Sequence, residues 1–477
     1  PFPVDNNGGK ASHRSQLTEA TVRSGAGSRN SQSPSRFGEY DRSWEGTIER
    51  FGDTLMSEAT TRPALWPAAK ITFVAALLLF VITVVIGILN GLDLYEPDHD
   101  TLITHVHAGT LGWITLAVSG AALLMFSHGR DLTDRDVARS RTLAWSMTGA
   151  IALYVAAFLI GDRIPGDRIQ RPIVGTILFI VVIWFAVWLF RVNRDAEGSS
   201  VARLGLLLSW VSLLIGSVLG VLLGIYTSQG KIPGIDDDTA AAVAEGHPPA
   251  MVIGFLILAA MAVIEWLLRD HTPWADNKWG VAQMWILFAA GVLANVGFIT
   301  QLEEELLGPA NLLMIIGVVI MVARYRTELR PSGWKGVGTG AFARISSLFL
   351  VVYLVLGTVL IARVISGAMD FDALTEAEFG LVLAFDHSMF IGVMTNLLFG
   401  VIAYGLLQRS EIRTVDRILL WGVNLGIVGF VIGLLTVSPI LKRLSTPIMG
   451  TALLIGIGIY ISEIARSDSE ATEAAGR

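Results

Sequence analysis

The chain has 477 residues, of which 53% are hydrophobic and 16% are charged, and its formal net charge is −6. This balance argues against an ordinary water-soluble domain and is typical of a polytopic membrane protein. Because the chain has no cysteine, disulfides, thiolate metal sites, cysteine-ligated iron–sulfur clusters and covalently attached c-type haem are excluded.

Residues 1–62 differ from the rest, since they are rich in Ser, Arg, Gly and Asn and have few apolar runs. We read them as a mostly disordered cytoplasmic tail, with a short interfacial helix around residues 39–55 as the alternative. We expect no signal peptide, because the first apolar stretch begins late and is long enough to span the membrane. We therefore expect three parts: the tail 1–62, a membrane domain 63–466 and a cytoplasmic C-terminal tail 467–477.

Twelve apolar segments are long enough to cross a bilayer as helices, which requires about 20 residues each. The sequence therefore predicts an all-α integral membrane protein with twelve transmembrane helices. The expected spans are 66–92, 101–127, 139–161, 172–192, 203–226, 246–268, 278–300, 306–325, 342–366, 379–407, 417–439 and 444–464.

Charge differs between the two sets of linkers. Those after spans 2, 8 and 10 are rich in arginine, whereas those after spans 1, 5 and 7 carry clustered carboxylates. Because Lys and Arg stay on the cytoplasmic side, we expect both termini in the cytoplasm and the protein in the cell (inner) membrane. Spans 2, 6 and 10 then begin at the outer face.

One histidine opens each of spans 2, 6 and 10, and the three are separated by 140 residues each. A glycine follows each histidine within a few residues. The equal spacing predicts three pseudo-repeated four-helix units, with chance spacing as the alternative. The residues are His107, His247 and His387, with Gly112, Gly254 and Gly392.

Histidines inside a membrane cost several kcal/mol unless they are paired or ligated, so we interpret these as ligands. A packed, hydrogen-bonded histidine is the alternative for any one of them. His105 and His107 lie two residues apart, which places them about 200° apart around a helix. One helix can thus address two cofactors. Neutral imidazole is a common axial ligand of haem, whose large apolar ring suits a groove between helices.

Three motifs carry a family resemblance. They are "HVHAGTLGW" (105–113), "GHP" (246–248) and "DHSMFIGVMTN" (386–396). In a twelve-span pattern they resemble subunit I of the heme-copper oxidase superfamily, nearest to the C-type oxidases and nitric oxide reductases. The resemblance implies three arcs of four helices with metal ligands on spans 2, 6, 7 and 10. Span 7 has no histidine, and Met251 stands where many oxidases have a tyrosine.

The resemblance implies one or two b-type haems. One would lie between spans 2 and 10, held by His387 and either His105 or His107. The remaining span-2 histidine would ligate a second haem or form a supporting hydrogen bond.

A non-haem metal site is implied near span 6. His247 would bind a non-haem iron, or copper, together with carboxylates from the run Glu303, Glu304 and Glu305, because oxygen ligands favour iron. A solvated loop is the alternative for that run.

Three further carboxylates are candidates for proton chemistry. Glu245 and Asp386 adjoin ligand histidines and would orient their rings or relay protons as catalytic groups. Glu265, near the inner end of span 6, would serve proton transfer or snorkel beside Arg269.

We therefore expect a haem redox protein of respiratory electron transfer, acting as an oxidoreductase that reduces O2 or NO at a modified site. A non-catalytic electron carrier, sensor or accessory subunit is the first alternative, and a haem-free transporter is the second. Expected partners are the lipid bilayer, additional subunits and an electron donor: a basic soluble protein attracted to the acidic outer loops, an adjacent subunit or quinol. No nucleic-acid partner is expected.

Overall fold

The computed structural model describes residues 63–128, 132–161, 168–194, 200–269, 273, 276–330, 338–369 and 373–475, with side chains up to residue 467. The expected tail 1–62 lies outside these residues. The described part of the chain is helical throughout its long segments and contains twelve helices that are long and apolar enough to cross a membrane. The all-α, twelve-span prediction is confirmed at this level.

The spans lie within a few residues of their predicted bounds, except that the sixth begins at Asp237, nine residues before its predicted start at 246. Several spans change helix type along their length and carry more than one label. In chain order they are α2 (Trp66–Gly91), α3–η1–α4 (His99–Ser127), α5 (Asp134–Ile160), α6 (Gln170–Arg194), α7 (Val201–Gln229), α8–α9–η3–α10 (Asp237–Arg269), α11 (Lys278–Thr300), α12 (Glu303–Arg324), α14 (Gly340–Ile365), α15–η7–α16–η8 (Glu376–Leu406), α17–η9–α18 (Thr414–Leu435) and α19 (Pro439–Ala475). The helix α19 continues past the predicted end of span 12.

Polar residues at the helix starts explain where several spans begin. The side chains of Asp98, Thr133, Asp236 and Thr375 each accept a hydrogen bond from a backbone N–H of the first helical turn. Such caps satisfy donors that the helix itself leaves free. Asp237 and Asp238 belong to the first turn of α8 and not to a loop, which also suits the helix dipole.

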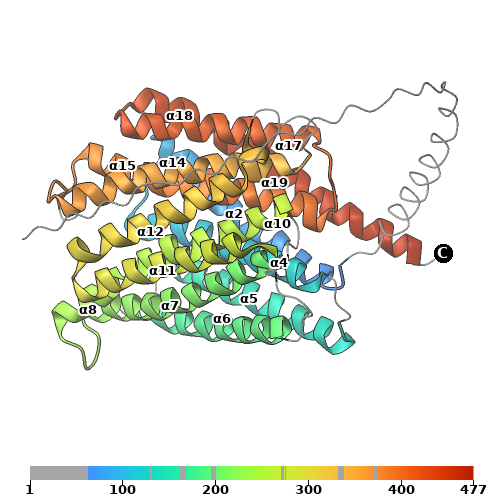
Figure 1. Ribbon diagram of the computed structural model, residues 1–477, viewed down its shortest axis with the longest axis horizontal. Helices are drawn as coiled ribbons and strands as arrows, with labels where there is room; N and C mark the ends of the chain where they lie inside the picture. Colours follow the sequence, from blue (N-terminus) through green and yellow to red (C-terminus); the bar gives the residue numbers. More distant parts are fainter. Residues whose placement is uncertain are drawn as a thin grey trace, which may run out of the picture. The chain divides into compact units, whose positions relative to one another are not determined.

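Burial separates three spans from the other nine. In the most apolar part of spans 2, 6 and 10, 83%, 78% and 89% of residues are buried, whereas the other spans range from 28% to 50%. The long helices run alongside one another, with α8 and the start of α15 at one end and α17 at the other (Figure 1). We call these the α8 end and the α17 end. The three histidine-bearing spans therefore form the centre.

Aromatic rings connect the central helices with their neighbours. Trp113 of span 2 stacks on Phe80 of α2 at 4.7 Å between ring centroids, and it lies 5.3 Å from Phe399 of span 10. Its Nε1 donates a hydrogen bond of 3.0 Å to Thr395 Oγ1. Because indole N–H is satisfied inside the core, this contact fixes spans 2 and 10 in one register.

Candidate functional site

Four histidines lie in the central spans towards the α8 end, and a π-helix follows each group. The π-helix η1 (Ala108–Thr115) starts directly after His107, and η7 (Ser388–Thr395) starts directly after His387. The third, η3 (Ala250–Leu256), starts three residues after His247. Widened turns of this kind are rare and are frequently found at functional sites.

Two of the histidines bind the backbone of the preceding span. His105 Nδ1 lies 3.0 Å from the carbonyl oxygen of Thr83 in α2, and His247 Nδ1 lies 2.8 Å from that of Gly216 in α7. A carbonyl oxygen only accepts, so each Nδ1 carries the proton and donates. The lone pair of each neutral ring is then on Nε2.

The other two histidines bind the backbone of their own helix. His107 Nδ1 lies 2.9 Å from the carbonyl oxygen of Ile103, and His387 Nδ1 lies 2.8 Å from that of Leu383. The same argument leaves their Nε2 atoms unprotonated. All four imidazoles thus have the tautomer, fixed by a hydrogen bond on the other nitrogen, that metal-ligating histidines have.

Each span-2 histidine has a histidine of another central span as an electrostatic neighbour. His105 interacts with His387 of span 10, whereas His107 interacts with His247 of span 6. The ring contacts also place the two span-2 side chains against different helices. His105 lies against Gly87 of α2. His107 instead packs against the ring of Phe158 of α5.

Matching contacts recur where each central span packs on the span before it. The fifth residue of each π-helix is a glycine, and a Cβ added there would come within 3.1 Å of a side chain of the preceding span. Eight residues beyond that contact, the preceding span has a glycine of its own, which contacts the central helix. The first contacts are Gly112 with Leu79, Gly254 with Ser212 and Gly392 with Phe349. The second contacts are Gly87 with His105, Gly220 with His247 and Gly357 with Phe385. Phe385 thus stands where His105 and His247 stand in the other two contacts.

Aromatic and charged side chains pack around His107. Its ring stacks on Phe158 at 4.2 Å and meets Tyr154 edge-on at 5.6 Å. The guanidinium of Arg171, from the start of α6, lies 4.8 Å from the centroid of the Phe158 ring. Arg171 is buried, and its Nη2 forms an ion pair with Asp100. These contacts hold the ring of His107 in one orientation.

The carboxylates predicted to bind a metal with His247 lie at the start of α12. Glu304 and Glu305 are exposed in the first turn of α12, with Glu303 half-buried beside them. Within the described residues, no three His, Asp or Glu side chains gather as a non-haem metal site requires. Glu245 is exposed at the last residue of α8.

Asp386 lies at a different kind of position. It is half-buried next to His387 and is an electrostatic neighbour of Tyr353 in α14. The hydroxyl of Tyr353 is buried and has no hydrogen-bond partner among the described residues.

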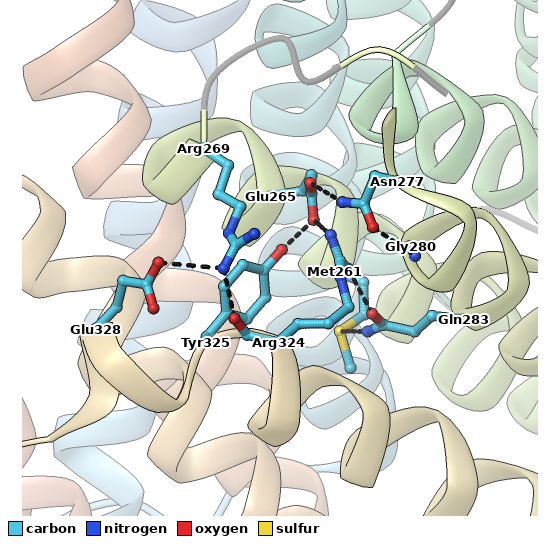
Figure 2. A network of polar contacts seen from close by, with 9 residues as sticks. All are labelled: Met261, Glu265, Arg269, Asn277, Gly280, Gln283, Arg324, Tyr325 and Glu328. Carbon is cyan, nitrogen blue, oxygen red and sulfur yellow. Dashed lines mark hydrogen bonds and ion pairs between the residues drawn. The ribbon is translucent and has the colours of Figure 1, made fainter. Parts of the chain in front are cut away.

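A second polar site lies at the α17 end, centred on Glu265, and Figure 2 shows it. Glu265 is fully buried, and its Oε2 accepts hydrogen bonds from Arg324 Nη2, at 2.5 Å, and from the Tyr325 hydroxyl. The expectation that Glu265 snorkels beside Arg269 is wrong. Arg269 instead pairs with Glu328 at 3.3 Å and stacks on Tyr325. The reason is that α12 supplies a closer guanidinium.

The Glu265 site joins three spans. Asn277 Nδ2, before α11, lies 3.4 Å from Glu265 Oε1, and Arg324 Nη1 donates to Gln283 Oε1 of α11 at 2.6 Å. Burial, and then the Glu265 carboxylate, raise the pKa of Tyr325 well above its usual range. Tyr325 therefore stays a proton donor to the carboxylate.

A similar site binds the last three spans together at the same end. Asp416 of α17 is fully buried, pairs with Arg409 Nη2 at 3.1 Å and accepts a hydrogen bond of 2.5 Å from the Tyr460 hydroxyl. Sequence reasoning missed both sites, because Tyr325 and Tyr460 lie 60 and 44 residues from their carboxylates. The only sequence signal for either site is Glu265, a carboxylate within an apolar span.

The chain was also compared with known proteins. It matches no protein-family model and no curated protein.

Proposed function

We propose that this chain is a membrane redox protein in which His105 and His387 ligate a b-type haem between spans 2 and 10. One observation carries the proposal: these two imidazoles come from different central helices, are electrostatic neighbours, and both have Nδ1 bound to a carbonyl. Two neutral histidines with unprotonated Nε2 atoms, on two membrane-spanning helices, are what a low-spin haem iron would take as its protein ligands. With no cysteine in the chain, the haem would be bound without a covalent link.

A glycine and an aromatic ring lie against the two histidines. Gly87 gives the His105 ring its place, since a Cβ there would come within 3.2 Å of the imidazole Cε1. The His387 ring lies 5.1 Å from the ring of Phe430 in α18. Both rings are half-buried inside a mostly buried layer of the protein. When bound there, haem would supply one-electron redox chemistry.

The matched glycine contacts support three related four-helix units. Each unit would consist of four successive spans, with its second span in the centre. Three such units are the organisation that the resemblance to heme-copper oxidase subunit I implies. We include this arrangement in the proposal.

Electron transfer is the activity that the histidine pairing supports best. If His105 and His387 both hold the haem iron, they would leave no ligand site free for a gas, which suits electron transfer more than gas binding. The reduction of O2 or NO would need a non-haem metal near His247, and among the described residues no group of three His, Asp or Glu side chains supports such a site. We therefore propose an electron-transfer or accessory role within a respiratory complex.

The direction of the chain in the membrane completes the proposal. Arginines gather at the α17 end, including Arg203, Arg324 and Arg409, and the α8 end exposes Glu304 and Glu305. Following the positive-inside rule, the α17 end would face the cytoplasm. The acidic outer end would then attract a basic electron donor more than a neutral quinol.

The proposal is tested by optical spectroscopy of the purified protein. We expect a low-spin b-type spectrum and a haem that acid acetone extracts. His105→Ala and His387→Ala should each remove the same spectral component, because each deletes one ligand of one iron. His99→Ala, at an exposed residue that opens α3, is the matched control and should leave the spectrum intact. A wild-type protein without a Soret band would refute the proposal.

A further inference from the structure

We propose that His107 and His247 bind a second haem, between spans 2 and 6, so that the chain carries two. This inference rests on the proposed function, since it extends the same chemistry to the other histidine pair. It replaces a non-haem metal at His247 with a porphyrin, which brings four nitrogen ligands of its own and needs two from the protein.

The second pair has the same chemistry as the first. One imidazole, His247, donates Nδ1–H to a carbonyl of the preceding span, as His105 does in the first pair. Its partner, His107, donates Nδ1–H to its own helix, as His387 does. Each pair therefore joins one histidine of each kind, and both pairs leave two Nε2 lone pairs for an iron.

The matched contacts explain why there are two pairs and not three. In each central span, one position contacts a glycine of the preceding span, and it is filled by His105, His247 or Phe385. Two residues further along lies the second position, filled by His107, Pro249 or His387. Going around the three units, the first position of one unit pairs with the second position of another. The observed pairs are His105 with His387 and His247 with His107, and the same rule would match Phe385 with Pro249.

The third combination cannot bind a metal. Neither a phenyl ring nor proline has a ligand atom in its side chain, and Phe385 stacks on Tyr353 at 4.3 Å with an angle of 20° between the rings. The phenyl ring of Phe385 thus occupies the position that an imidazole occupies in the other two units. Two haems per chain, rather than one or three, follow from this pattern.

Glycine contacts make the second site sensitive to residues that are not ligands. A Cβ at Gly220 would lie 2.8 Å from Cε1 and 3.0 Å from Nδ1 of His247. Any side chain there must move the imidazole or break its bond to Gly216. Gly149 of α5, with no atom within 4 Å of its would-be Cβ, is a matched control for adding a methyl group to a helix.

The test is haem content per chain, measured by the pyridine haemochrome method on purified full-length variants. We expect two haems in the wild type. His107→Ala and His247→Ala should each leave one and lose the same spectral component, and His105→Ala and His387→Ala should each lose the other. The His107→Ala/His247→Ala double variant should still hold one haem, because the two deletions affect a single iron.

Two further measurements separate ligation from misfolding. Imidazole added to His247→Gly should restore the lost component, since a free imidazole can occupy the vacated ligand position. Gly220→Ala should weaken that component alone, whereas Gly149→Ala should change neither. One haem in the wild type that His107→Ala and His247→Ala leave unchanged would overturn this inference and leave the proposed function standing. A wild type without haem would overturn both.

Discussion

Replacing Glu265 by Gln should destabilise the protein strongly, although it changes neither the size of the side chain nor any histidine. The carboxylate is fully buried and accepts hydrogen bonds from Arg324 and Tyr325 through one oxygen. Hydrogen bonds to charged groups contribute about 1.5–3 kcal/mol each. Glutamine still offers an oxygen to one donor, but it leaves the Arg324 guanidinium buried without its countercharge.

The expected loss follows from that uncompensated charge. Removing one partner of a buried ion pair costs about 3–5 kcal/mol. Because Gln283 Oε1 still accepts from Arg324, we place E265Q at the lower end, at about 3 kcal/mol less free energy of unfolding. The double variant E265Q/R324M should recover part of this loss, since no buried charge then remains unpaired.

Unfolding in mixed micelles with increasing SDS, followed by tryptophan fluorescence, measures these differences. Glu304→Gln, at an exposed carboxylate of α12, is the control and should change the free energy of unfolding by less than about 1 kcal/mol. If E265Q stays within about 0.5 kcal/mol of the wild type, as ordinary surface substitutions do, the buried ion pair does not hold these spans together and the reasoning fails.

Three other predictions concern packing, orientation and charge. Gly291→Ala should destabilise by about 1–3 kcal/mol in the same unfolding assay, because its Cβ would meet the backbone of Gly254 at 2.7 Å; an effect no larger than that of Gly149→Ala would contradict the close approach of α11 and η3. Asp237→Cys, in a chain that has no other cysteine, should react with a membrane-impermeant thiol reagent from outside intact cells, and reaction only after permeabilisation would reverse the proposed topology. Arg171→Gln should lower the midpoint potential of the His107–His247 haem alone, because it removes a positive charge beside Phe158. Equal shifts of both haems in a redox titration would show that Arg171 does not lie closer to this haem than to the other.

The sequence was sufficient for the spans because hydropathy reports the cost of an unpaired backbone in lipid, which depends on local composition. The opposite projection of His105 and His107 could also be predicted, because helix geometry alone determines it. The residues that contact each histidine ring could not be predicted, since they depend on which helices pack together. The 140-residue spacing, for example, predicts that His107, His247 and His387 occupy corresponding positions. The contacts match His247 with His105 instead, 142 residues apart, because Gly220 and Gly87 contact these two rings.

The polar sites at the α17 end show the same limit. Glu265 is an unusual residue in an apolar span, and the cation nearest to it in the sequence is Arg269, four residues away. Local sequence offers that partner, whereas the folded chain brings Arg324 and Tyr325 from two spans later. Burial then favours the closest desolvated pair over an exposed one, because an uncompensated charge is most costly in the interior.

The central claim is that histidine pairs between the central spans hold haem iron, and the ratio of haem to polypeptide in the purified wild-type protein tests it most directly. Haem is quantified by pyridine haemochrome after acid-acetone extraction, and polypeptide by amino-acid analysis of the same sample. The account predicts two b-type haems per chain. A protein that is folded in detergent, after production in cells supplied with haem, and still contains none would contradict it.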